Sequence, residues 1–178
     1  NRVQELVAKA SALAGSGVEW HVIGPVQGNK TRDVAEMADW VHTVDRPRIA
    51  ERLSAQRPPE RPPLDVCIQV NVSGEATKSG IRPDEAPALA EAVERLSGLR
   101  LRGLMSIPEA CEDFDGQRHA FAALRAVFED LKARGHALDT LSMGMSDDLE
   151  AAIAEGATLV RVGSAIFGGR PSPTGSDL

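Results

Sequence analysis

Short runs of β-branched and aliphatic residues alternate along the chain with longer stretches in which apolar side chains recur every three or four residues. The short runs predict strands at residues 19–23, 40–44, 66–72, 101–107, 140–142 and 159–162. The longer stretches predict helices at residues 2–14, 31–38, 47–55, 84–96, 117–132 and 147–154. Because strands and helices alternate, the pattern indicates an α/β fold with a parallel sheet.

The spacing of these elements favours one particular α/β architecture. Each β-α unit takes about 30 residues, as in a (β/α)8 TIM barrel of roughly 250 residues. A barrel short of two strands would have two unpaired sheet edges, so we expect two further β-α elements ahead of Asn1. An open, doubly wound sheet is the alternative, and it needs no additional strand. We expect one barrel domain over residues 1–170 and a tail over residues 171–178.

Composition narrows the classes of partner. The 178 residues carry a net charge of −6 without a dense block of Lys and Arg, which argues against a nucleic-acid partner. No apolar run resembles a membrane span or a secretory signal. Cys67 and Cys111 show no paired spacing with each other or with the histidines, so we expect reduced thiols, no metal site and a cytoplasmic protein.

Small and hydroxyl-bearing residues follow the last two predicted strands. Gly144 to Ser146 and the pair Gly163 and Ser164 each stand between a strand and a helix. In a barrel these are the loops after strands seven and eight, where a phosphate group is most often bound. Backbone N–H groups and hydroxyls in such loops predict a phosphorylated small molecule as the ligand. Ser146 either binds the phosphate or only caps the following helix, and the sequence leaves both open.

Arg161 is the charged residue of the last predicted strand, two positions before Gly163. A buried arginine is costly unless it is paired, which favours a surface role or a ligand role over an idle core position. If its side chain faces the mouth of the barrel, it can donate to a ring nitrogen or to a carboxylate.

Five segments carry a resemblance, in order along nearly the whole chain. They are Trp20–Lys30, Ile68–Ser73 with Lys78–Gly80, Arg102–Pro108, Leu141–Asp148 and Arg161–Gly168. Together they resemble the pyridoxal phosphate homeostasis protein family, which is similar to the N-terminal barrel domain of alanine racemase. Only the last residues, 171–178, fall outside the resemblance.

The resemblance implies a (β/α)8 barrel that holds pyridoxal 5′-phosphate through a Schiff-base lysine. It implies that Ser146 and the amides of Gly163 and Ser164 bind the cofactor phosphate, and that Arg161 contacts the pyridine nitrogen. Asn71 and Met105 are the further cofactor-binding positions that it implies. An arginine beside the ring nitrogen keeps that nitrogen unprotonated, which makes the ring a weaker electron sink.

A Schiff-base lysine must project from a strand into the pocket, and none of the four lysines is placed to do so. Lys9 and Lys132 fall in predicted helices, Lys30 opens a helix, and Lys78 lies in a long loop. In the family the lysine lies on the first strand, and Asn1 matches the end of the Gly-Glu-Asn turn after the second. We therefore expect the lysine ahead of Asn1, assign no catalytic residue within the chain, and expect phosphate binding here to be non-covalent.

Three functions follow from this site. The first is a pyridoxal phosphate-binding homeostasis protein, not an enzyme, whose partners are the cofactor and pyridoxal phosphate-dependent apo-enzymes, and which is either a monomer or a weak dimer. The second is an amino-acid racemase, which usually needs a phenolic second base, and the chain has no tyrosine. The third is a phosphate-ester isomerase, whose base would be Glu109, a residue that reads as a loop charge.

Overall fold

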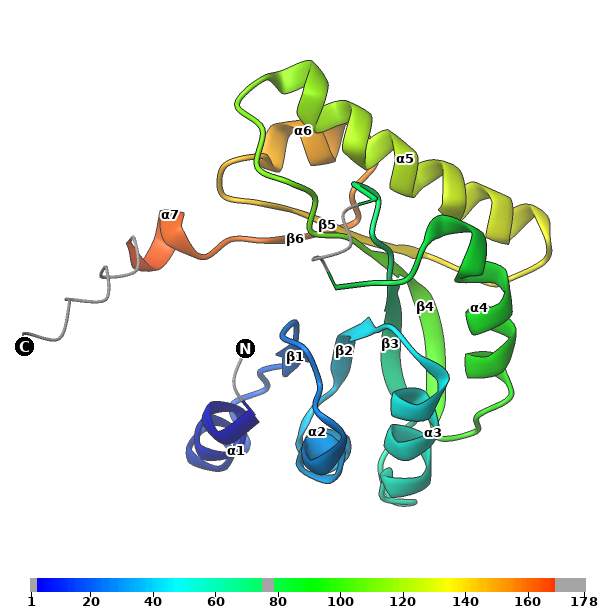
Figure 1. Cartoon of the computed structure of the whole chain (residues 1–178). Coiled ribbons are helices and arrows are strands. Elements are labelled where there is room, and N and C mark those ends of the chain that lie inside the picture. The colour runs from blue at the N-terminus through cyan, green and yellow to red at the C-terminus, as the bar shows by residue number, and fades with distance from the viewer. Residues whose placement is uncertain (1–2, 75–78, 169–178) are drawn as a thin grey trace, which may run out of the picture.

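The computed structural model describes residues 3–74 and 79–168 and contains one parallel β-sheet (Figure 1). Its strands are β1 (His21–Val22), β2 (Trp40–Val44), β3 (Leu64–Gln69), β4 (Leu99–Met105), β5 (Thr140–Met145) and β6 (Leu159–Arg161). The strands lie in the order β1-β2-β3-β4-β5-β6, and each pairs in parallel with its neighbour in sequence. A doubly wound sheet requires a point at which the strand order reverses. This sheet has no such point among its described strands, so the alternative of a doubly wound sheet is wrong.

The helices are α1 (Val3–Ala12), α2 (Thr31–Met37), α3 (Pro47–Gln56), α4 (Ala86–Glu94), α5 (Phe114–Ala133), α6 (Leu149–Ala154) and α7 (Ser164–Phe167), with 3-10 turns η1 (Gly28–Lys30) and η2 (Pro83–Glu85). Helices α1 to α6 cover one side of the sheet, whereas α7 lies apart from it (Figure 1). All six predicted helices are confirmed in kind and approximate position. In the described segments, no helix is long and apolar enough to cross a bilayer.

The main core lies between the sheet and the helices, and α5 shows how the sequence builds it. Phe121, Leu124, Phe128 and Leu131 recur at helical spacing and are all buried, so they form one apolar face. Burying each of these side chains contributes about 1.5–3 kcal/mol. Asp113 begins the helix, because its carboxylate accepts the Gly116 N–H at 2.8 Å.

A second, smaller core occupies the opposite face of the sheet. It consists of Trp40, Cys67 and Met105, which come from β2, β3 and β4. The Arg102 guanidinium lies 4.8 Å from the centre of the Trp40 ring, a cation–π distance. Side chains alternate between faces along a strand, so His42, two residues after Trp40, faces the same interior.

The curvature of the sheet is shown by a contact across this interior. His42 on β2 lies 2.7 Å from the Ser142 hydroxyl on β5, although β3 and β4 stand between these strands in the sheet. A flat sheet would hold the two strands about 14 Å apart at the usual strand spacing. The six strands therefore form part of a curled sheet, and β1 and β6 do not pair within the described residues.

The boundaries of β5 and α6 differ from those predicted. The strand continues to Met145, and α6 begins at Leu149. Gly144 makes this possible: its φ is +92°, and a Cβ there would lie 2.5 Å from the Ala152 Cβ. Only glycine adopts this conformation easily, so α6 packs directly on the end of the strand. The predicted tail at residues 171–178 lies outside the described residues.

Candidate functional site

The two predicted phosphate loops are adjacent in space, because β5 and β6 are neighbours and both end at the same edge of the sheet. The Ser146 Oγ accepts hydrogen bonds from the N–H groups of Gly163, at 3.4 Å, and Ala165, at 3.3 Å. These bonds are long; Gly163 and Ala165 are exposed, and Ser146 is partly buried. The hydroxyl thus occupies a position between two backbone donors, where a phosphate oxygen would also be stabilised.

Ser146 does not cap the following helix. The N-cap of α6 is Asp148, and it makes no side-chain capping bond. The Asp148 carboxylate instead accepts the Met145 N–H at 2.6 Å, which closes the turn after β5. The interpretation of Ser146 as only a helix cap is therefore wrong, while its predicted contact with a phosphate stays a prediction.

Arg161 points into the interior of the curled sheet, so the surface role is wrong. Its Nη1 donates to the Ser142 Oγ at 2.8 Å and its Nη2 to the Ser106 carbonyl at 3.0 Å. Burial lowers the pKa of the guanidinium, but an arginine remains protonated at neutral pH. Among the described residues, no carboxylate forms an ion pair with it. The site therefore contains a fixed positive charge that is held by neutral groups.

Two histidines continue this chain of polar contacts. His42 lies 2.7 Å from the Ser142 Oγ through Nδ1 and 2.9 Å from His21 Nδ1 through Nε2. Burial, and then the charges of His21 and Arg161, lower the pKa of His42 to about 3. Burial also lowers the pKa of His21. Both rings are therefore neutral at physiological pH.

The donors in this chain can be assigned from its ends. Arg161 can only donate, so the Ser142 Oγ accepts from it and directs its own hydrogen to His42 Nδ1. The neutral His42 ring then carries its proton on Nε2 and donates to His21 Nδ1. Every donor from Arg161 Nη1 to His42 Nε2 thus has an acceptor.

A cavity of about 370 Å³ opens between β1 and β6, and His21, His42 and Arg161 are among its lining residues. Small-molecule sites commonly have volumes of 300–1,000 Å³. Two buried polar atoms at this edge, Arg161 Nε and the Ser106 Oγ, have no hydrogen-bond partner in the described part of the chain. The cavity and the unsatisfied atoms together fit a polar small molecule.

Comparison with known proteins identifies the family. A family model described as the alanine racemase N-terminal domain matches residues 1–171. The chain is 60% identical over 170 residues to the pyridoxal phosphate homeostasis protein of Pseudomonas aeruginosa, and the match covers 96% of this chain and 73% of that protein. It is 54% identical over 173 residues to the protein of the same name from Escherichia coli, and this match covers 96% of this chain and 74% of the Escherichia coli protein. The chain belongs to the pyridoxal phosphate homeostasis protein family.

A solved structure in this comparison carries the cofactor. PipY of Synechococcus elongatus, determined with pyridoxal phosphate bound, superposes with a TM-score of 0.84 and is 34% identical. The match covers 94% of this chain and 79% of PipY. The resemblance to the pyridoxal phosphate homeostasis protein family is thus confirmed at the level of both sequence and fold.

The two remaining predicted site residues, Met105 and Asn71, lie at different depths in the structure. Met105 is fully buried with Trp40 and Cys67, in register with Ser142 on the next strand. Asn71 follows β3, and its side-chain oxygen accepts the Gly74 N–H at 3.1 Å. Met105 thus supports the floor beneath the strand ends, and Asn71 closes a loop above them. Their contacts with a cofactor remain predictions.

The lysines that the structure describes lie away from the strands. Lys9 is on α1, Lys30 in η1 and Lys132 on α5, where its Nζ stands 5.2 Å from the Phe128 ring centre. Asn1 and Lys78, which the sequence analysis also considered, lie outside the described residues. None of the described lysines projects from a strand into the cavity.

The sequence analysis missed His21 and His42 as parts of the site, and it gave Ser142, at the end of a predicted strand, no specific role. A signal existed, because His42 stands in an otherwise apolar strand, two residues after Trp40 and thus on the same face. What the sequence could not show is that β2 and β5 approach each other across the interior. No group of three metal-ligating side chains is found in residues 3–74 and 79–168.

Proposed function

We propose that this chain binds pyridoxal 5′-phosphate at the ends of β5 and β6 and acts in the homeostasis of that cofactor. One observation carries the proposal: Ser146, Gly163 and Ala165 form a cradle of hydrogen-bonding groups directly after β5 and β6. Arg161, the last residue of β6, stands next to this cradle in the sequence. The curated relatives are named for this role, and PipY binds the cofactor. When bound, pyridoxal phosphate supplies an aldehyde and an electron-withdrawing ring.

Each group of the site has a distinct task in this proposal. Ser146 and the amides of Gly163 and Ser164 would hold the phosphate, and Arg161 would contact the pyridine nitrogen. A fixed cation disfavours a second positive charge beside it, so Arg161 keeps that nitrogen unprotonated. Ser142 and His42 hold the guanidinium in place as neutral groups. Asn71 and Met105 complete the wall and the floor of the pocket.

The same groups argue for binding rather than for catalysis. A racemase needs a second base on the opposite face of the substrate, and the sequence contains no tyrosine. His42 is a weak base with its pKa at about 3, and both of its ring nitrogens already have partners. Glu109 is an exposed loop residue whose N–H donates to the Ser73 hydroxyl at 3.3 Å. These features favour a carrier without strong catalytic activity over a racemase or a phosphate-ester isomerase.

We further infer that the sheet is six strands of a (β/α)8 barrel. The chain spans about three quarters of the length of the curated relatives, 73% for the Pseudomonas aeruginosa protein, and β1 and β6 are the two edge strands of the described sheet. The first strand of such a barrel adjoins the last, so a Schiff-base lysine on it would face Arg161 and the Gly163 loop. The predicted domain over residues 1–170, the cytoplasmic location, a monomeric or weakly dimeric state and apo-enzyme partners belong to this proposal.

A titration with pyridoxine 5′-phosphate tests the binding site. This analogue has the ring and the phosphate but no aldehyde, so it does not react with lysines. We expect pyridoxine 5′-phosphate to bind at least tenfold more tightly than pyridoxine, because only the phosphorylated compound can bind to the phosphate cradle. Ser146→Ala should weaken binding about fivefold, whereas Ser97→Ala, an exposed hydroxyl elsewhere, should not. Equal affinity for the two vitamers, or no saturable binding, would show that the cradle does not bind phosphate.

A further inference from the structure

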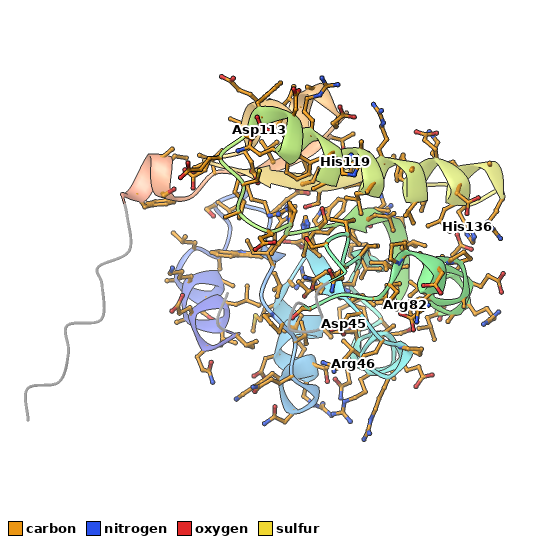
Figure 2. All side chains as sticks on the ribbon, turned by 45° about the horizontal axis from the view of Figure 1, so that its top comes forward. Asp45, Arg46, Arg82, Asp113, His119 and His136 are labelled. Atoms are coloured by element: carbon orange, nitrogen blue, oxygen red, sulfur yellow. The ribbon has the colours of Figure 1, made fainter. Side chains whose placement is uncertain are left out.

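A second cavity, of about 650 Å³, lies between the loop after β1 and the start of α3. Its charged lining residues are Arg46, Arg48 and Arg52, and the loop of Gln27, Gly28 and Asn29 faces them. Arg46 lies with Asp45 where β2 leads into α3 (Figure 2). The cavity between β1 and β6 is lined by His21, Ile23, His42 and residues 159–162, so the two cavities do not share lining residues.

The arginines of this cavity are poorly neutralised. In the described segments, Arg48 forms no ion pair or hydrogen bond, and Arg52 only donates from Nε to the Thr31 hydroxyl at 3.2 Å. Arg46 has one carboxylate neighbour, with Nε 3.3 Å from the Asp45 oxygen. The cavity is therefore positively charged in a protein whose net charge is −6.

This arrangement costs stability unless an anion is bound. Arg48 and Arg52 are four residues apart on α3 and share one face, and like charges at this spacing repel. An arginine guanidinium presents parallel N–H donors that match phosphate oxygens. A phosphate between the two side chains would replace repulsion by charge-assisted hydrogen bonds.

The backbone around the cavity offers a donor as well. Helix α3 has no side-chain capping bond at its start. Pro47 has no N–H and the Ile49 N–H donates to the Arg46 carbonyl at 3.2 Å, so among the described residues the Arg48 N–H is the first-turn donor left beside the cavity. A Cβ on Gly28 would meet nothing within 4 Å, which leaves open space beside the loop. These features support the arginines, which carry the argument.

We propose that this cavity is a second ligand site and that it binds a small phosphate monoester. The concave shape and a volume within the usual range for small-molecule sites favour a single phosphorylated metabolite over a flat polyanionic surface. The negative net charge of the chain also disfavours long polyanions. A protein that takes up a phosphorylated ligand at this cavity would sense a phosphate ester separately from the one at β5 and β6.

Amide chemical shifts of the 178-residue chain under titration with inorganic phosphate, at constant ionic strength with chloride, test this site. The wild-type amides of Gly28, Asn29 and Arg48 should shift saturably. Arg48→Gln with Arg52→Gln should weaken this binding at least tenfold. The matched control, Lys9→Gln with Arg95→Gln, also removes two exposed cations and should leave it unchanged. Ser146→Ala should alter only the shifts around Gly163, which separates this site from the proposed cofactor site.

Three outcomes would overturn the proposal. The first is the absence of saturable shifts in the wild-type protein, which does not depend on the folding of any variant. The second is equal weakening by the cavity pair and by the control pair, which would indicate general electrostatics. The third is co-sedimentation with vesicles of phosphatidic acid and phosphatidylcholine without any response to free phosphate, which would identify a lipid headgroup as the ligand.

Discussion

Arg161 donates from Nη1 to the hydroxyl of Ser142, 2.8 Å away. The same hydroxyl lies 2.7 Å from His42, so it links β6 to β2 across the interior of the curled sheet. Ser142 is completely buried. Together with the Ser106 carbonyl, which accepts from Nη2 at 3.0 Å, the Ser142 oxygen therefore holds the guanidinium in the position where the proposed cofactor ring would meet it.

Ser142→Ala should reduce the free energy of unfolding by about 2–3 kcal/mol. The substitution leaves Arg161 Nη1 and His42 Nδ1 buried without partners, and each such group costs about 1–3 kcal/mol. Urea denaturation measures the change, with Ser97→Ala as an exposed control. A loss below 0.5 kcal/mol would mean that the polar chain does not contribute to stability.

The stability of the protein should fall as the pH falls from 7 to 5. The pKa of His42 is 6.5 in the unfolded chain and about 3 in the folded one. Below pH 6.5 only the unfolded state binds a proton there, so the free energy of unfolding decreases, by about 2 kcal/mol at pH 5. The loss continues until the pH reaches the folded pKa near 3.

His42→Gln should flatten that pH dependence, because glutamine does not titrate. Urea denaturation at pH 7 and pH 5 measures it, and His119→Gln, which removes an exposed histidine on α5, should keep the wild-type slope. An unchanged slope in His42→Gln would show that His42 titrates alike in both states.

Gly144→Ala should destabilise the fold by roughly 2–4 kcal/mol. Alanine would carry both the cost of a left-handed backbone and a clash at 2.5 Å with the Ala152 Cβ. Gly135→Ala is the matched control: its φ is +99°, but a Cβ there meets nothing within 4 Å, so about 1 kcal/mol is expected. Thermal denaturation of both variants separates backbone strain from packing, and equal losses would exclude the clash.

The two cysteines should differ in reactivity. Burial raises the pKa of the Cys67 thiol far above its ordinary value, and its side chain is completely buried in the smaller core with Trp40 and Met105, whereas Cys111 is exposed. The thiolate is the reactive form, so Ellman's reagent should modify one thiol in the native protein and two in guanidinium chloride. Rapid modification of both thiols in the native state would mean that the smaller core around Cys67 opens readily.

The parts of the structure that depend on local pattern were predictable. The apolar stripe of α5 and the loops around Ser146 and Gly163 follow from neighbours in sequence, and the structure confirms their positions. The contact of His42 with Ser142 joins residues 100 positions apart. It depends on the curvature of the sheet, which the periodicity of the strands does not encode. The end of β5 was also not predictable from local pattern. The strand continues through Gly144, whose positive φ lets α6 pack closely against it, and this packing is a contact between two elements.

The uninterrupted strand order has a consequence for how the protein forms. Each new β-α unit adds to an edge that the preceding units have already built, so few pairings need to wait for distant parts of the chain. A chain of this kind can assemble progressively from its amino end as the ribosome releases it. The exception is the Ser142 link, which closes only after β5 has emerged and then draws the early strands around the pocket.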